Sequence, residues 1–157
     1  MMSERNAWLA LDDQALLRLC RCEACRGTGP GGQKRNKTST SIRLVHLPTG
    51  IAVEDDATRS QHQNRDGALR KLRLQLAMEL REEPVANVGS MPPEKARQPF
   101  WVALALDALA SCGFRIAEAA ALMGISTARL GKDLSRIPPL WQRVNAARVE
   151  HGIPPLK

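Results

Sequence analysis

The segment Gly29-Pro30-Gly31-Gly32-Gln33, followed by Lys34, Arg35, Asn36 and Lys37, constrains the fold of this chain more than any other part of it. Three glycines around a proline disfavour both helix and regular strand, because glycine enters positive φ at little cost while proline fixes its own φ at about −65°. We therefore expect an exposed loop. Little side-chain bulk precedes the amide of Gln33, and several cations follow it, which favours approach to a crowded, anionic target. Nucleic acid is such a target.

The composition is that of a globular protein. With 157 residues, of which 43% are hydrophobic and 25% charged, the chain fits one ordinary domain, or one small domain with an appendage. Its longest apolar stretch, residues 100–110, is interrupted by Asp107 and is too short for a membrane span, so no membrane partner is expected. The N-terminus lacks the pattern of a secretory signal, which predicts a cytoplasmic, reducing location without disulfides.

Positive charge is concentrated around the glycine-rich segment. The net charge is +7, and residues 26–81 hold eleven cations against five anions, whereas residues 1–25 hold three against four and residues 82–157 nine against seven. Because phosphate binding is chiefly electrostatic, residues 26–81 are predicted to contact nucleic acid. A merely solvated basic face is the alternative interpretation.

Hydrophobic periodicity predicts an N-terminal region of strands and helices. A short helix is expected over residues 14–19, and strands over 21–26, 38–47 and 51–54, the last two joined by the turn Pro48-Thr49-Gly50. A long helix follows over residues 60–81, with Ser60 as its N-cap. Alternation along the second strand places Ile42, Leu44 and His46 on one face and Arg43, Val45 and Leu47 on the other. The long helix is expected to bury one stripe of apolar residues: Ala68, Leu69, Leu72, Leu76 and Leu80.

The C-terminal part reads as a separate helical module. From Glu82 to Pro99, four prolines and several polar residues predict a linker, which gives domains at 1–82 and 99–157 with the linker at 83–98. Helices are expected over residues 100–112, 116–123, 126–136 and 140–151, with Phe100, Trp101 and Trp141 in their core.

Residues 117–134 resemble a helix-turn-helix, with Gly124 at the turn and Ser126 as N-cap of the second helix. Arg129, Lys132 and Arg136 lie along that second helix, which suggests contact with nucleic acid. A structural or protein-binding role for this module is the alternative.

Three cysteines cluster in the first predicted strand. Cys20, Cys22 and Cys25 are too few for the usual four-ligand zinc site, and the fourth cysteine, Cys112, is distant in sequence. Buried thiols are the preferred interpretation and zinc binding is the alternative, so neither a metal nor a cofactor is predicted.

Four ordered segments together resemble the catalytic domain of class I peptide chain release factors. They are Gly29-Pro30-Gly31-Gly32-Gln33-Lys34-Arg35-Asn36-Lys37-Thr38, then His46-Leu47-Pro48-Thr49-Gly50-Ile51, then Arg59-Ser60-Gln61, and Asn64-Arg65 with Ala68-Leu69. The resemblance covers about residues 12–81. It implies an α+β domain, a small mixed sheet packed on one long helix, here followed by the all-helical module.

The resemblance also implies hydrolysis of the ester in peptidyl-tRNA, at the peptidyl transferase centre of the large ribosomal subunit. Gly31 and Gly32 would admit the loop, and the main-chain N–H of Gln33 would stabilise the negative charge that develops in the reaction. The side-chain amide of Gln33 would orient the attacking water. In this family such a glutamine is often methylated at N5 by a dedicated methyltransferase, so Gln33 is a candidate modification site and that enzyme a candidate partner.

The cations around the loop have implied roles in RNA binding. Lys34, Arg35, Asn36 and Lys37 would contact rRNA or tRNA phosphates. Many family members have a histidine and a small apolar residue where this chain has Lys34 and Arg35. Arg59 and Arg65, near the start of the long helix, would either contact rRNA or cap the helix.

Features of complete release factors are missing from this sequence. Only about twenty residues precede the first predicted strand, and no Pro-x-Thr or Ser-Pro-Phe tripeptide of the codon-reading type occurs. We therefore expect a codon-independent hydrolase that rescues stalled ribosomes, with the helical module in place of the basic tail usual in such relatives. The alternatives are a non-catalytic regulator that binds RNA or ribosomes and, less favoured by the loop, a DNA-binding regulator.

Overall fold

The computed structural model describes residues 2–25 and 40–157 and divides the chain into two compact units, Met1–Leu76 (unit 1) and Ala77–Lys157 (unit 2). Each unit has its own set of buried apolar side chains. Over the described ranges, none of the helices combines the length and the apolar character needed to cross a membrane.

Unit 1 contains a three-stranded sheet in the order β1-β2-β3. Its strands are β1 (Cys20–Cys25), β2 (Ser41–His46) and β3 (Ala52–Asp55), and both neighbouring pairs are antiparallel. The predicted α+β class is confirmed, but the sheet is antiparallel and not mixed. The connection 47–51 between β2 and β3 is too short for the crossover that a parallel pair needs.

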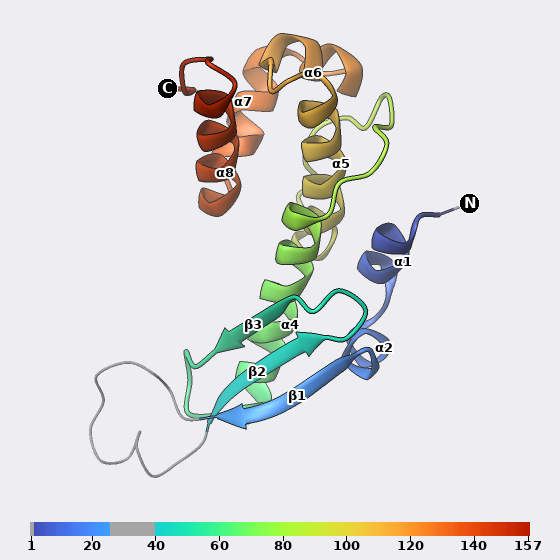
Figure 1. The fold of residues 1–157 in the computed structure, drawn as a ribbon, viewed down its shortest axis with the longest axis vertical. Coiled ribbons are helices and arrows are strands. Elements are labelled where there is room, and N and C mark those ends of the chain that lie inside the picture. The colour runs from blue at the N-terminus through green and yellow to red at the C-terminus, as the bar shows by residue number, and fades with distance from the viewer. Residues whose placement is uncertain (1, 26–39) are drawn as a thin grey trace. The chain divides into compact units, whose positions relative to one another are not determined.

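One face of this sheet packs on the long helix α4 (Gln61–Glu79), as the sequence predicts (Figure 1). The three strand residues expected on that face are buried, and so are the first four members of the predicted helical stripe: Ile42, Leu44 and His46 in β2, and Ala68, Leu69, Leu72 and Leu76 in α4. Leu80 is half-buried and lies just beyond the helix. Ser60 caps α4, since its Oγ accepts a hydrogen bond from Gln63 N at 3.2 Å.

Two short helices precede the sheet. The second, α2 (Asp13–Arg18), agrees with the prediction, whereas the first, α1 (Glu4–Ala10), was not predicted. Trp8 of α1 packs edge-on against His46, with ring centroids 4.7 Å apart. Arg73 of α4 donates to Leu9 O at 3.3 Å and to Asp13 Oδ1 at 2.8 Å. These contacts hold both helices in unit 1.

Unit 2 is helical. A short 3₁₀ turn, η1 (Lys95–Arg97), precedes α5 (Gln98–Ser111), α6 (Ile116–Met123), α7 (Thr127–Ser135) and α8 (Pro138–Glu150), so the four predicted helices are all present. Trp101 is buried as expected, while Phe100 and Trp141 are half-buried.

The segment predicted as a linker, residues 83–98, is hydrogen-bonded to these helices within unit 2. Asn87 N and Gly89 N donate to the last turn of α6 at 2.8 Å each, through Leu122 O and Met123 O. Trp101 Nε1 donates to Gly89 O at 3.0 Å. The segment therefore covers part of the helical core.

Asp107, which interrupts the apolar stretch, is a buried acceptor. Arg81 Nη1 lies 2.9 Å from its Oδ1, and Glu82 N donates to the same oxygen at 3.0 Å. Burying a carboxylate costs little only when it is paired and hydrogen-bonded, and both conditions are met here.

Candidate functional site

The candidate site lies at the end of the sheet from which the glycine-rich segment leaves. Cys25 of β1 and Ser41 of β2 are the last paired residues there, so the chain leaves and re-enters the sheet at neighbouring positions. The predicted catalytic and RNA-binding residues of that segment, Gly31, Gly32, Gln33, Lys34, Arg35, Asn36 and Lys37, lie outside the described residues.

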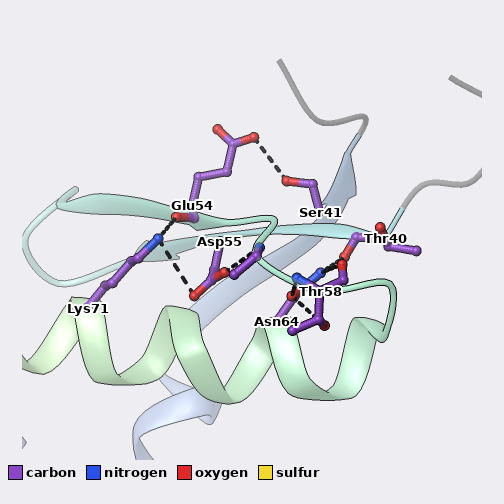
Figure 2. Close-up of polar contacts among 8 residues, drawn as sticks. Thr40, Ser41, Glu54, Asp55, Thr58, Asn64 and Lys71 are labelled. Atoms are coloured by element: carbon purple, nitrogen blue, oxygen red, sulfur yellow. Dashed lines mark hydrogen bonds and ion pairs between the residues drawn. The ribbon is translucent and has the colours of Figure 1, made fainter. Parts of the chain in front are cut away.

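Asn64 of α4 is hydrogen-bonded to Thr40, where the chain re-enters the sheet after the glycine-rich segment. Its side chain is 1% exposed, and its Nδ2 donates to Thr40 O at 2.7 Å and to Thr58 O at 2.9 Å. Its Oδ1 accepts from Thr58 N and Thr58 Oγ1, both at 2.9 Å (Figure 2). An amide has two donors and one acceptor oxygen, and all of them are used. Asn64 therefore joins the residue before β2 to the turn before α4.

Asp55 closes the same end of the sheet from β3. This buried carboxylate accepts from Ala57 N at 2.9 Å and lies 3.6 Å from Lys71 Nζ, which also donates to Glu54 O at 2.9 Å (Figure 2). A Cβ at Gly67 of α4 would lie 2.1 Å from Asp55 Oδ2. The helix can approach the carboxylate only because residue 67 is glycine.

A second polar cluster joins the three strands on the opposite face. Cys25 Sγ lies 3.3 Å from both Ser41 Oγ and Glu54 Oε1, and Ser41 Oγ donates to Glu54 Oε1 at 3.1 Å. Burial raises the pKa of the Cys25 thiol, and Glu54 acts in the same direction while the hydrogen bond with Ser41 opposes it. The thiol therefore stays protonated near neutral pH and is a poor nucleophile.

The predicted burial of the clustered cysteines is wrong. Cys22 is exposed, and Cys20 and Cys25 are half-buried. The reason is that β1 is an edge strand with only β2 beside it, so its side chains are covered incompletely. Burial still raises the pKa of Cys20 to about 11, with Cys22 contributing to the shift.

Among residues 2–25 and 40–157, no three His, Cys, Asp or Glu side chains gather so that they could hold a metal ion.

The predicted arginines near the start of α4 differ in their surroundings. Arg59 is exposed, whereas Arg65 is half-buried, with its Nη2 2.9 Å from His62 Nδ1. A pocket of about 230 Å³ is lined by neither of these arginines but by Asp55, Ala57, Thr58, Gln63, Asn64, Asp66 and Arg70. Asp66 and Arg70 were not singled out from the sequence, where nothing distinguishes them from other charged residues of the helix.

The helix-turn-helix expected in unit 2 is present in its local geometry. Gly124 ends α6 at φ +74°, and Ser126 caps α7 by accepting from Arg129 N at 3.1 Å. Arg129 Nε lies 3.2 Å from the buried carboxylate of Asp133, whereas Lys132 is exposed.

The chain is similar to known proteins over its first half and somewhat beyond. Residues 17–98, slightly more than half of the chain, match the RF-1 domain. Peptide chain release factor 1 of Xylella fastidiosa is 55% identical over 51 residues, which cover 32% of this chain and 14% of that protein. Peptide chain release factor 2 of Phenylobacterium zucineum is 49% identical over 68 residues, covering 43% and 18%. Peptide chain release factor 2 of Caulobacter vibrioides is 44% identical over 77 residues, covering 45% and 21%.

Each match therefore spans about a fifth or less of the relative's own length. The matched family range includes the glycine-rich segment, β1 to β3 and α4, and it ends where α5 begins. Helices α6 to α8 lie outside it.

Proposed function

Because this chain belongs to the RF-1 domain family, the catalytic domain of class I peptide chain release factors, we propose that it hydrolyses the ester of peptidyl-tRNA on the ribosome. The observation that carries the proposal is the family match, which extends through Gly31, Gly32 and Gln33. In this proposal these three residues are the catalytic element, and the rRNA of the large subunit and peptidyl-tRNA are the partners.

The chemistry proposed for the loop needs a donor and not a protein base. The main-chain N–H of Gln33 donates to the oxyanion, or to the departing ribose oxygen, where negative charge develops in the transition state. The side-chain amide of Gln33 orients the attacking water. Lys34, Arg35, Asn36 and Lys37 contact the surrounding RNA, as do Arg59 and Arg65 at the start of α4.

The anchoring contacts in unit 1 support this role. A loop that delivers one backbone donor to a reacting ester must be held at its base, because small displacements of a catalytic group cost large factors in rate. Asn64 fixes Thr40, the first described residue after the loop, through its hydrogen bond to Thr40 O. Asn64 is thus a positioning residue in the proposed mechanism.

The proposed substrate is a ribosome that has stalled without a stop codon, and the proposed location is the cytoplasm. We propose that the helical unit after the catalytic domain supplies recognition that does not depend on the codon. Methylation of Gln33 at N5 by a glutamine methyltransferase is also proposed, and an added methyl group on the Gln33 peptide in mass spectrometry would establish it.

The decisive experiment measures peptide release from purified ribosomes that carry peptidyl-tRNA and no stop codon in the decoding site. We expect the natural sequence to release peptide there at a rate that a stop codon does not increase. Gly31→Ala and Gly32→Ala should each lower the rate by at least about 10²-fold, the loss typical of removing one oxyanion donor.

Gln33→Ala tests the side-chain role, with Gln14→Ala as its matched control, because Gln14 is an exposed glutamine of α2. Release by Gly32→Ala at the natural rate would contradict the mechanism. Release that requires a stop codon would contradict codon independence. Ribosome binding without any release would favour the alternative function, a non-catalytic regulator that binds RNA or ribosomes.

A further inference from the structure

Helix α7 presents a face to solvent whose composition is unusual. Its middle is formed by small side chains, Thr127, Ala128, Gly131 and Ser135, and among the described residues no side chain and no backbone outside the adjoining turns of α7 lies within 4 Å of the position a Cβ would take on Gly131. Lys132 and Arg136, four residues apart, lie along one side of the same surface. We call these six residues the α7 face.

The orientation of this face is fixed from the buried side of the helix. Leu130 and Leu134 are fully buried, and Asp133 is 1% exposed. The carboxylate of Asp133 accepts from Met91 N at 2.9 Å and thereby ties α7 to the segment that precedes α5. The α7 face is consequently a firmly supported surface.

All exposed charge on α7 is positive. Asp133, its single anion, is buried and paired with Arg129. Lys132 and Arg136 are exposed, and within the described parts of the chain neither forms an ion pair. Exposed cations without a protein partner beside small side chains complement a phosphate backbone that approaches closely.

The same residues argue against the reading of base sequence in a DNA major groove. Such reading relies on bidentate contacts from arginine or lysine to guanine and from asparagine or glutamine to adenine, made by the N-terminal residues of the recognition helix. The α7 face carries no asparagine or glutamine, and its cations Lys132 and Arg136 lie toward the C-terminal end of α7. Arg129, which borders the face nearer the N-terminus of α7, is held through Nε by Asp133. RNA duplexes, in contrast, are recognised by shape and by phosphate and 2′-hydroxyl contacts across a wide, shallow minor groove, which suits short side chains flanked by cations.

We propose that the α7 face binds the sugar-phosphate surface of a double-stranded RNA helix. The further identification of that helix as part of a ribosome rests on the proposed function. In this arrangement Lys132 and Arg136 contact phosphates, Thr127 and Ser135 reach 2′-hydroxyl groups, and Arg129 supports the face through its pairing with Asp133.

The test measures binding of the full chain to a fluorescently labelled RNA duplex of mixed sequence, and to a DNA duplex of the same sequence, across a salt series. The variant K132A/R136A removes two exposed cations from the α7 face. Its matched control, K95A/R97A, removes two exposed cations from η1 in the same unit. A third variant, K132R/R136K, keeps both charges in place.

We expect K132A/R136A to bind the RNA duplex on the order of 10-fold more weakly and to lower the slope of log affinity against log salt by about 2, one for each lost phosphate contact. The control and the charge-preserving variant should bind like the natural sequence. An equal loss in K95A/R97A, no loss in K132A/R136A, or tighter binding of the DNA duplex would each overturn the inference.

This experiment is independent of catalysis. Gly32→Ala should bind the RNA duplex like the natural sequence although it loses peptide release. A chain that shows α7-dependent duplex binding but releases no peptide would contradict the proposed function and support the inference about α7.

Discussion

Gly67 occupies a position in α4 where helix formation alone would favour another residue. Glycine costs about 1 kcal/mol relative to alanine in the interior of a helix. A tertiary contact explains why glycine is present in spite of this cost, since a Cβ at this position would lie 2.1 Å from Oδ2 of the buried Asp55. The residue is therefore explained by a contact between strand and helix at the base of the proposed catalytic loop.

We predict that Gly67→Ala lowers the free energy of unfolding by about 1–3 kcal/mol, the usual cost of overpacking, in spite of its better helix propensity. Urea unfolding measures this change. Gly131→Ala in α7 is the matched control, because its Cβ would meet nothing within 4 Å, and there we expect a gain of up to about 1 kcal/mol. A similar gain in both variants would show that the contact with Asp55 is unimportant.

Asn64 illustrates how far single residues can be interpreted from sequence. Asn64 belongs to one of the four segments that resemble class I release factors. The residues to which it is hydrogen-bonded, Thr58 and Thr40, lie 6 and 24 positions earlier in the chain. Nothing in the sequence states that one amide joins both. The strand periodicity, by comparison, correctly placed Ile42, Leu44 and His46 on one face, and all three are buried, because alternation along a strand is a local property.

Helix α1 depends on tertiary contacts. It has seven residues, one buried apolar side chain in Leu9, and a cap in which Asn6 N donates to Ser3 Oγ at 3.4 Å. Isolated helices of this length are unstable in water. Its docking relies on Trp8, which packs against the buried ring of His46.

His46 makes this docking sensitive to pH. Burial lowers the pKa of His46 from its ordinary value of 6.5. Its Nδ1 lies 2.8 Å from Thr49 Oγ1, while Nε2 is buried and has no hydrogen-bond partner within residues 2–25 and 40–157. A protonated imidazole needs an acceptor at both nitrogens, so the neutral ring is favoured in the folded state.

The sign of the pH effect follows from this difference. Below pH 6.5 the unfolded chain binds a proton that the folded chain resists, so stability is complete above that pH and is lost as the pH falls. We predict that the free energy of unfolding decreases from pH 7.5 to 5.5, with a slope from this one group of at most about 1.4 kcal/mol per pH unit. In His46→Phe, which keeps an aromatic ring beside Trp8, this part of the pH dependence should disappear. An unchanged pH profile would exclude His46 as its source.

The same contact explains why α1 was not predicted while its neighbours were. Within the described residues, the predicted strands and α4 agree with the structure to within a few residues, because their apolar residues repeat at strand or helix spacing; residues 26, 38 and 39 of the predicted strands lie outside that range. In α1 the stabilising partner belongs to β2, far along the chain. For residues 83–98, prolines suggest an open connection, but the bonds of Asn87 and Gly89 to α6 depend on the tertiary structure.

At the scale of the whole molecule, the two units carry the two proposed surfaces separately. The glycine-rich segment falls in the range of unit 1, and the α7 face belongs to unit 2 and lies beyond the family match, which ends at residue 98. The sequence predicted the four helices of unit 2, since their apolar periodicity is a strong local signal. The predicted loop lies outside the described residues. The sequence did not predict which cations of α7 are free to bind RNA, because the burial of Asp133 and its pairing with Arg129 arise only in the folded unit.

This separation predicts different kinetic effects for variants of the two surfaces. A contact made equally in the ground state and the transition state changes KM alone, whereas a contact made in the transition state changes kcat. With stalled ribosomes as the varied reactant, K132A/R136A should raise KM on the order of 10-fold and leave kcat unchanged, and Gly32→Ala should lower kcat by at least about 10²-fold with little change in KM. Single-turnover release measured over a range of ribosome concentrations distinguishes the two effects. A fall in kcat for K132A/R136A would mean that α7 also acts in the chemical step, and the proposed division between a catalytic unit and a binding unit would then be wrong.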